Sequence, residues 1–521
     1  MNNEQKVSRA AGAVSMMTLL SRLFGFARDV VIAMMFGSSA AADAFFVAFR
    51  VPNMQRRVLG EGAVSAAFIP MFAEIRDQKG KDEAWAFTAN LLNILLVILA
   101  VSTLALWVFA PQVVTVFAPG FLDEPGKFEI TVRLTRWMAP YLIFIGLAAF
   151  CMGILNSFQK FALAAAAPVL LNISMIGAAL WIAPLLDEPI LGLATGVLIG
   201  GALQLAIQIP QTLRQGLHFS PRVDVRHPDI RRMARLMGPV ILGLAVYELN
   251  ILADTLIASL LPGGSISYLY YGNRLVQFPL GIFGVALGVA LLPMLSSQAA
   301  KKATGEFIQT LGFGIRMILF VTLPATVGLI LLRFPIVNTL WERGEFTRAS
   351  SEGTAVALLY YSLGLAAFSG IKVIVPAYYS LQDTKTPARI GIYSMLLNII
   401  LNLILMQPMG HGGLALATSL SSVFNVFMLI HLLRKRLGLM GGRRILASGL
   451  RIAVNAALMG GLIYLMDAAW FDAASPLLEK LLMLSACVVA GVAAFAGLAR
   501  FTQPEELRFL LSPGARSRTA K

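Results

Sequence analysis

Seven ionisable residues lie inside the first two long apolar segments of this chain, where membrane-spanning helices are expected to carry almost none. They are Arg22, Arg28 and Asp29 in the first segment and Arg50, Arg56, Arg57 and Glu61 in the second, with Asp43 where the second begins. Each charge costs ~2.5–3.5 kcal/mol to insert at a helix centre, so it needs a partner or a water-filled cavity. Five of the seven are arginines, whose planar guanidinium matches carboxylate and phosphate oxygens. The pattern predicts a membrane protein with a central cationic cavity that holds an anion.

The composition places the chain among helical membrane proteins that cross the bilayer many times. Of its 521 residues, 58% are hydrophobic and 13% are charged, and the mean hydropathy is +0.76. The net charge of +15 is explained by basic residues retained in cytoplasmic loops, so nucleic-acid binding is not predicted. Cys151 and Cys487 lie in apolar segments and are expected to pack as small hydrophobic side chains.

Fourteen apolar segments have the length and composition of membrane spans. We place them near 12–36, 41–71, 84–111, 131–157, 162–185, 190–211, 237–261, 268–297, 311–333, 352–380, 386–408, 412–434, 447–467 and 478–501. Basic connections, such as 214–235 and 434–444, alternate along the chain with acidic ones, such as 123–124 and 187–188. This asymmetry predicts an even number of spans with both termini in the cytoplasm.

A weak internal repeat divides the chain into two halves. GAVSAAFIPMF around Pro70 is similar to GVALGVALLPML around Pro293, and the LLNI of 170–173 recurs at 396–399. Six spans in each repeat give both halves one orientation, which predicts two lobes in a parallel pseudo-two-fold arrangement with a binding site between them. The expected divisions are an N-terminal lobe (1–213), a cytoplasmic linker with a surface-lying amphipathic piece (214–236), a C-terminal lobe (237–436), and two extra spans with a cytoplasmic tail (437–521).

The charges of the first two spans have two interpretations. In the first, the charges pair with one another in a buried network, which explains Arg57 with Glu61, four residues apart, and Arg28 with Asp29. It does not account for five arginines against two or three acids. We therefore predict anion binding by Arg22, Arg28 and Arg56, and a structural role for Arg50 and Arg57.

The second half contributes fewer candidate residues. Arg274 is a lone arginine inside the eighth span and is expected to face the same cavity. Lys372 is a further candidate, with a snorkelling lysine as the alternative. Asp383 is predicted in a turn before a helix, with a gating or structural role. Other candidates for the cavity or its gating are Asp29, Asn53, Glu61 and Ser267.

An acid in the seventh span, Asp254, raises the question of a bound cation. Asn398, Asn402 and Thr418 offer neutral oxygens that could join Asp254 around a sodium ion, while a protonated or hydrogen-bonded Asp254 is the alternative. The four histidines show no metal-ligand spacing. The chain carries no phosphate-cradling glycine–lysine loop and no nucleophile elbow, so we do not expect an enzyme.

Several motifs around these charges identify a family. SRLFGFARDVVIAMMFG, ADAFFVAF, GEGAVSAAFIPMF, YYGNRL and YSLQDTKTP resemble the MurJ/MviN family, the bacterial lipid II flippases of the multidrug/oligosaccharidyl-lipid/polysaccharide exporter superfamily. The resemblance covers essentially the whole chain. It implies a two-lobed, 14-helix protein of the inner membrane that works by alternating access on undecaprenyl-linked disaccharide-pentapeptide.

The resemblance also assigns residues to roles. The family's essential cavity arginines correspond to Arg22, Arg28, Arg56 and Arg274, and its cavity acid to Asp43. The sodium site of some members corresponds to Asp254, Asn398, Asn402 and Thr418. The chain departs from the family pattern at Asn273, where members carry Asp, and at Asn402, which replaces a carboxylate.

The charge pattern of the sequence and the family resemblance agree on a mechanism in which the arginines bind the pyrophosphate of lipid II. Spans 13 and 14 would form a lipid-facing groove for the polyprenyl tail, and membrane lipids and cell-wall synthesis proteins are candidate partners. The alternatives are an exporter of another polyprenyl-linked oligosaccharide, a drug antiporter, an anion channel, and a non-transporting scaffold for cell-wall synthesis. A drug antiporter should have an acidic cavity, which counts against it. The energy source does not follow from the sequence, and sodium and chloride are both candidate ions.

Overall fold

The computed structural model of this chain describes residues 3–57, 64–217, 220–221 and 223–511. Within these ranges the secondary structure is helical and contains no β-strand, as the hydropathy pattern predicts. The chain forms two compact units, the first from residues 1–266 and 343–346, the second from residues 267–342 and 347–521.

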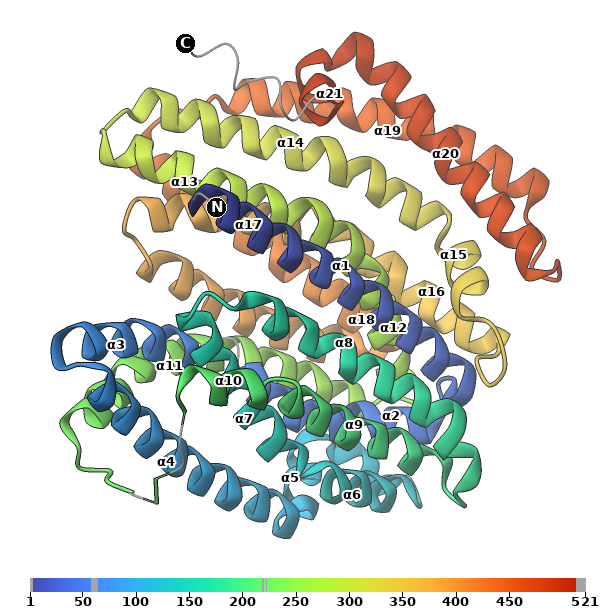
Figure 1. Cartoon of the computed structure of the whole chain (residues 1–521). Coiled ribbons are helices and arrows are strands. Elements are labelled where there is room, and N and C mark those ends of the chain that lie inside the picture. The colour runs from blue at the N-terminus through green and yellow to red at the C-terminus, as the bar shows by residue number, and fades with distance from the viewer. Residues whose placement is uncertain (1–2, 58–63, 218–219, 222, 512–521) are drawn as a thin grey trace. The chain divides into compact units, whose positions relative to one another are not determined.

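The first unit is built from eleven α-helices and short 3-10 and π turns (Figure 1). They are α1 (Asn3–Phe36), α2 (Ala40–Gln55), α3 (Val64–Lys79), α4 (Lys81–Val108), α5 (Ala110–Phe117), η2 (Pro119–Asp123), α6 (Lys127–Met138), α7 (Tyr141–Ser157), α8 (Phe161–Gly177), η3 (Ala178–Ile182), η4 (Ala183–Leu185), α9 (Pro189–Ala206), α10 (Ile209–Gln215) and α11 (Pro228–Ser259). An aromatic cluster that includes Phe68, Phe72, Trp85 and Phe150 joins α3, α4 and α7.

Helices α8 and α9 approach closely along a row of glycines. Gly192, Gly196 and Gly200 are spaced one per turn on α9, and a Cβ atom on Gly196 would lie only 3.0 Å from the Cα of Met175 on α8. Small residues at such spacing let helix backbones meet within a membrane, where packing rather than the hydrophobic effect drives association. Helix α8 also packs along α1, which carries the first charged segment.

The second unit contains the remaining helices. They are α12 (Ser265–Pro279, whose first two residues belong to the first unit), η5 (Leu280–Gly284), α13 (Val285–Ala300), α14 (Thr304–Leu331), α15 (Arg333–Trp341), α16 (Arg348–Leu363), α17 (Leu365–Ser380), α18 (Lys385–Leu437), α19 (Gly442–Trp470), α20 (Leu477–Thr502) and α21 (Pro504–Leu511). Helix α14 packs against both α17 and α19, and a core that includes Phe320, Ile452 and Phe495 joins α14 to α19 and α20.

The described residues contain nine helices, or up to eleven with two bent helix pairs, that are long and apolar enough to cross a membrane. The bent pairs are α6 with α7, at 41°, and α16 with α17, at 42°. The eleventh and twelfth predicted spans form the single 53-residue element α18. Gly410 interrupts α18 with φ 55° and ψ −136°, a conformation that L side chains avoid and glycine accepts. The chain is therefore a multi-pass helical membrane protein, as the sequence predicts.

The polar segment between the predicted lobes is only partly a linker. Helix α10 ends at Gln215 and α11 begins at Pro228, so residues 228–236 extend the seventh predicted span by more than two turns. Asp229 in the first turn of α11 pairs with Lys79 of α3 at 2.8 Å, which fixes this extension against α3. The compact units divide after residue 266, whereas the lobes are defined by the repeat, so the lobe boundaries remain a prediction.

Candidate functional site

Arg28 on α1 is held in a fixed orientation by two neighbours. Its Nε and Nη2 atoms donate to Oδ1 of Asp29 at 3.0 and 2.6 Å, and its Nη1 donates to Oδ1 of Asn172 on α8 at 3.1 Å. Asn172 in turn donates to the backbone oxygen of Ser21 at 3.2 Å. Asp29 is fully buried, whereas the Arg28 side chain keeps 12% of its surface exposed. The Arg28–Asp29 pair expected from the sequence is confirmed, and Asn172 is a partner that spacing could not indicate.

The other arginines of the first unit differ in how they are held. Arg22 is exposed on α1. Arg56, at the end of α2, donates from Nε to Oδ1 of Asn53 at 3.0 Å, so Asn53 orients the guanidinium. Arg28 and Arg56 thus each donate to a neutral amide, and Arg28 is paired with Asp29 as well.

Arg50 and Arg57 instead connect α2 to α11. Nη1 of Arg50 lies 3.5 Å from the backbone oxygen of Ile251, and Nη1 of Arg57 lies 3.4 Å from Oε1 of the buried Glu248. Glu61, the partner predicted for Arg57, lies outside the described residues. These contacts give both arginines structural partners on α11.

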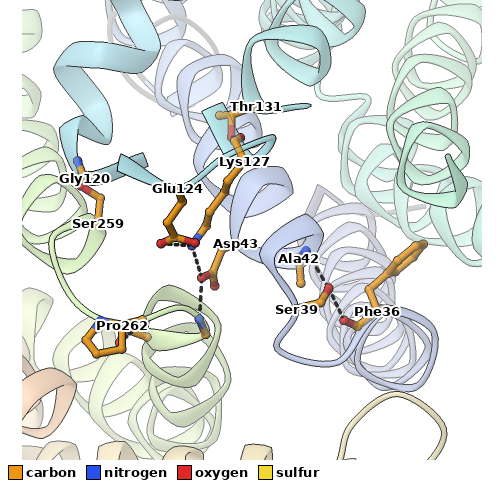
Figure 2. Close-up of polar contacts among 12 residues, drawn as sticks. Phe36, Ser39, Ala42, Asp43, Gly120, Glu124, Lys127, Thr131, Ser259 and Pro262 are labelled. Carbon is orange, nitrogen blue, oxygen red and sulfur yellow. Dashed lines mark hydrogen bonds and ion pairs between the residues drawn. The ribbon is translucent and has the colours of Figure 1, made fainter. Parts of the chain in front are cut away.

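Asp43 lies in a buried charge network at the start of α2 (Figure 2). Its Oδ2 atom accepts from Nζ of Lys127 at 3.2 Å and from the backbone amide of Gly264 at 2.8 Å. Lys127 also donates to Oε1 of Glu124 at 3.0 Å and lies 4.2 Å from the ring centre of Phe121. Asp43 and Lys127 are 1% and 3% exposed, so each charge depends on the other. The network joins α2, α6 and the loop after α11.

Sequence reasoning missed Lys127, although a signal was present. Lys127 is the first residue of α6, where the positive end of the helix dipole disfavours a cation. A lysine at that position indicates an acidic partner elsewhere in the fold, which here is Asp43 together with Glu124.

The cavity and gating candidates of the second unit lie on two helices and one turn. Ser267 and Arg274 lie on α12, Ser267 buried and Arg274 half-buried, and Lys372 is exposed on α17. Asp383 precedes α18 and accepts from the amide and hydroxyl of Thr386 at 3.0 and 2.8 Å. Arg436, at the other end of α18, lies 3.5 Å from the same carboxylate.

Three of the four residues considered for a cation come together on α18. Nδ2 of Asn402 donates to Oδ1 of Asn398 at 3.1 Å, and Nδ2 of Asn398 lies 3.4 Å from Oγ1 of Thr418. Asp254, the fourth, lies on α11 in the first unit. Amide and hydroxyl oxygens suit a hard cation such as sodium.

A separate apolar cavity of about 440 Å³ lies between α19 and α20. Its lining consists of six residues: Leu458, Met459, Ala494, Gly497, Leu498 and Phe501. Phe501 is 85% exposed, which is favourable only against an apolar surrounding such as lipid. The pair of helices predicted to lie outside the repeat therefore carries an apolar groove.

Together these features define a class of protein: a multi-pass helical membrane protein in which Arg28 is oriented by buried polar partners. Solved structures share this fold. A structure of a multidrug resistance MATE family transporter of the MOP superfamily, in an inward-facing conformation, is 14% identical, with a TM-score of 0.67, and covers 83% of this chain and 99% of its own. At that identity the match shows the fold alone.

The family follows from closer matches. Residues 32–484 match the family model described as "Lipid II flippase MurJ", and the chain belongs to this family. A probable lipid II flippase MurJ of Vibrio cholerae is 38% identical over 504 residues, covering 93% of this chain and 94% of that protein. A lipid II flippase MurJ of Burkholderia cenocepacia is 34% identical over 496 residues, covering 94% and 96%. A structure of lipid II flippase MurJ in an inward closed conformation is 27% identical, with a TM-score of 0.79 and coverage of 94% and 98%. The resemblance seen in the sequence motifs is thus confirmed.

Proposed function

We propose that this protein moves lipid II from the cytoplasmic to the periplasmic leaflet of the bacterial inner membrane by alternating access. The family and the flippases it resembles along most of their length support this conclusion. The substrate carries a pyrophosphate between an undecaprenyl tail and a disaccharide-pentapeptide. Its head group must cross ~30 Å of hydrocarbon, which is prohibitive without a polar cavity.

The proposed mechanism rests on one observation: the guanidinium of Arg28 is held in a fixed orientation. Each of its three nitrogens donates one hydrogen bond, to Asp29 or to Asn172, so the group loses little conformational entropy when an anion binds beside it. Arg22, Arg56 and Arg274 would supply the other cationic groups around the pyrophosphate. Guanidinium groups suit this role because two parallel N–H donors match two phosphate oxygens.

We further propose fourteen spans with both termini in the cytoplasm. Eleven spans follow from apolar length when each bent pair counts once. Dividing α18 at Gly410 adds one, and α1 and the α2–α3 pair, which carry the charged segments, add two. The count supports two lobes of six spans followed by α19 and α20.

The apolar cavity between α19 and α20 is the proposed path of the polyprenyl tail. Its lining is almost wholly aliphatic and aromatic, so a hydrocarbon chain can lie in it without desolvating polar groups. The head group would then cross through the lobes while the tail remains in the hydrocarbon.

For Asp43 we propose a gating role. Its carboxylate is occupied by Lys127 and by the amide of Gly264, and a second anion beside it would be repelled. Release of Asp43 would free the loop that connects α11 to α12. Lys127 becomes part of the same gate.

The coupling ion remains a prediction. The oxygens of Asn398, Asn402 and Thr418 favour sodium, and surplus arginine favours chloride. Replacing sodium by potassium, or chloride by gluconate, during a transport measurement tests each ion separately.

The function is tested by translocation of lipid II in sealed vesicles containing the purified protein. The appearance of head group on the far leaflet is followed for the wild type, Arg28→Ala and Arg28→Lys. Arg133→Ala is a matched control, because Arg133 lies in the same unit with 54% of its side chain exposed. We expect transport by the wild type and the control, and none by Arg28→Ala.

Each other outcome has a defined meaning. Equal transport by wild type and Arg28→Ala would retain the flippase and remove Arg28 from the mechanism. Transport by Arg28→Lys at the wild-type rate would show that a positive charge suffices for transport and that the two parallel N–H donors of a guanidinium are not required. If the folded wild type does not move lipid II but does move another polyprenyl-linked oligosaccharide, the substrate assignment changes.

A further inference from the structure

A second cavity, of about 220 Å³, lies where α19, the end of α20 and the start of α21 meet α14. The charged residues of its lining are Arg316 of α14, Arg444 and Arg451 of α19, and Glu505 and Glu506 of α21. Three guanidinium groups against two carboxylates leave a net positive charge in a small volume. None of these residues belongs to the proposed lipid II site.

The ion pairs of the cavity leave one arginine unused. Nε of Arg316 donates to Oε1 of Glu506 at 2.9 Å, and both side chains are more than nine-tenths buried. Nη2 of Arg444 lies 3.2 Å from Oε2 of Glu505. Arg451 forms no ion pair or hydrogen bond with the part of the chain that the structure describes. The surplus charge is therefore located on Arg451.

A buried hydroxyl lies between the two arginines of α19. Ser448 is 8% exposed, and its Oγ atom has no hydrogen-bond partner among the described residues. Arg444, Ser448 and Arg451 follow at i, i+4 and i+7, so they share one face of the helix. A buried hydroxyl without a partner costs free energy unless a ligand accepts its hydrogen bond. Here the ligand would be an anion, because Arg444 and Arg451 line the same cavity as Ser448.

The surface beyond Arg451 is apolar and leads to the larger groove. Val454 and Leu458 are 59% and 58% exposed and lie on the same side of α19 as Arg451, at i+3 and i+7. Leu458 also lines the cavity between α19 and α20. Seven residues of helix span roughly 10 Å, which an acyl chain attached to a phosphate at Arg451 can cover.

We propose that this cavity binds the phosphate of an anionic phospholipid, with an acyl chain lying along Val454 and Leu458. Arg451 and Ser448 bind the phosphate oxygens, and Arg444 shares its charge between the phosphate and Glu505. A phosphate ester is the chemical class; the adjoining apolar track favours a lipid over a soluble phosphate. Basic pockets at the ends of membrane helices bind lipid head groups in this way.

The test measures binding of phosphatidylglycerol to the purified full-length protein in detergent by native mass spectrometry. Phosphatidylcholine with the same acyl chains is the lipid control, and inorganic phosphate is added separately as a competitor. The variants are Arg451→Ala and Ser448→Ala. Arg443→Ala is the matched control, because Arg443 is the exposed neighbour of Arg444 and does not line the cavity.

We expect Arg451→Ala to weaken binding of phosphatidylglycerol about tenfold or more, because a hydrogen bond to a charged group is lost. Ser448→Ala should weaken it less, and Arg443→Ala should leave it unchanged. All variants should keep the thermal unfolding midpoint of the wild type, which separates loss of binding from loss of folding.

Three outcomes would overturn the proposal. Unchanged binding in Arg451→Ala removes the site, and equal weakening by Arg451→Ala and Arg443→Ala reduces it to general surface charge. Displacement of phosphatidylglycerol by inorganic phosphate at comparable concentration assigns the cavity to a soluble phosphate instead of a lipid.

Discussion

Nη1 of Arg28 lies 3.1 Å from Oδ1 of Asn172, a residue 144 positions later in the chain. The bond joins α1 to α8, which pack along each other in the first unit. Asn172 is 6% exposed and also donates to the backbone of Ser21, so its amide cannot rotate without losing a bond. The orientation of Arg28 is therefore set jointly by the carboxylate of Asp29 and by a neutral amide on a neighbouring helix.

Asn172→Ala should reduce lipid II transport about tenfold or more without lowering the amount of protein in the membrane. The reason is that a hydrogen bond to a charged group contributes ~1.5–3 kcal/mol, and Arg28 loses one that fixes its orientation. Initial translocation rates in vesicles, normalised to protein, measure the effect. Activity equal to that of the wild type would show that Asp29 alone positions Arg28.

Lys127→Met should destabilise the protein by about 3–5 kcal/mol, because it leaves the buried carboxylate of Asp43 without its ammonium partner. Thermal unfolding in detergent gives the comparison. Lys160→Met is the control, since Lys160 is exposed. The double variant Asp43→Asn with Lys127→Met should recover most of the loss, because no unpaired charge remains. A double variant as unstable as the sum of the single ones would contradict the pairing.

Gly196→Ala and Gly328→Ala should change stability in opposite directions. A Cβ on Gly196 would meet the Cβ of Ala178 at 2.6 Å and the Cα of Met175 at 3.0 Å, so overpacking should cost ~1–3 kcal/mol. A Cβ on Gly328 of α14 meets no atom within 4 Å, and alanine should stabilise the helix by up to ~1 kcal/mol. The thermal unfolding midpoints of the two variants are compared with that of the wild type. Equal shifts in one direction would refute the close α8–α9 contact.

Acid should remove a contribution to stability that Asp383 makes at neutral pH. Hydrogen bonds from Thr386, first of all from its backbone amide, hold the pKa of Asp383 below its ordinary value of 3.8. Because the pKa of Asp383 is lower in the folded state than in the unfolded state, the ionised carboxylate stabilises the folded state at pH values above the unfolded-state pKa. This contribution disappears as the pH falls through the folded-state pKa. Asp383→Asn should therefore unfold at a lower temperature than the wild type at pH 7, with the difference shrinking below about pH 4. A difference independent of pH would remove the charge from the explanation.

Much of the fold could be predicted because a bilayer imposes length and polarity on each span. The predicted segments 84–111 and 478–501 correspond to α4 (Lys81–Val108) and α20 (Leu477–Thr502), since hydropathy alone decides where such helices lie. The extension of α11 to Pro228 was missed, because its first turns are polar and rest on an ion pair with Lys79.

The candidate site was less predictable because its contacts are distant in sequence. Spacing along one helix identified Arg28 with Asp29. It could not identify Asn172, or Glu248 as the partner of Arg57, because both lie on helices whose packing against α1 and α2 is set by tertiary structure. The position of Lys127 signalled an acidic partner, but only the fold could show that this partner includes Asp43.

The network around Asp43 also implies an order of events during synthesis of the protein. The carboxylate and Lys127 leave the ribosome early, whereas Gly264, whose amide completes the network, follows Lys127 by about 140 residues. At ~5–20 residues per second this interval is roughly 7–28 s. The ion pair with Lys127 can therefore form before the residues of α11 and Gly264 have been synthesised, and the hydrogen bond from Gly264 is added later. Charge neutralisation of Asp43 thus needs only the first 127 residues of the chain, whereas the completed network needs 264.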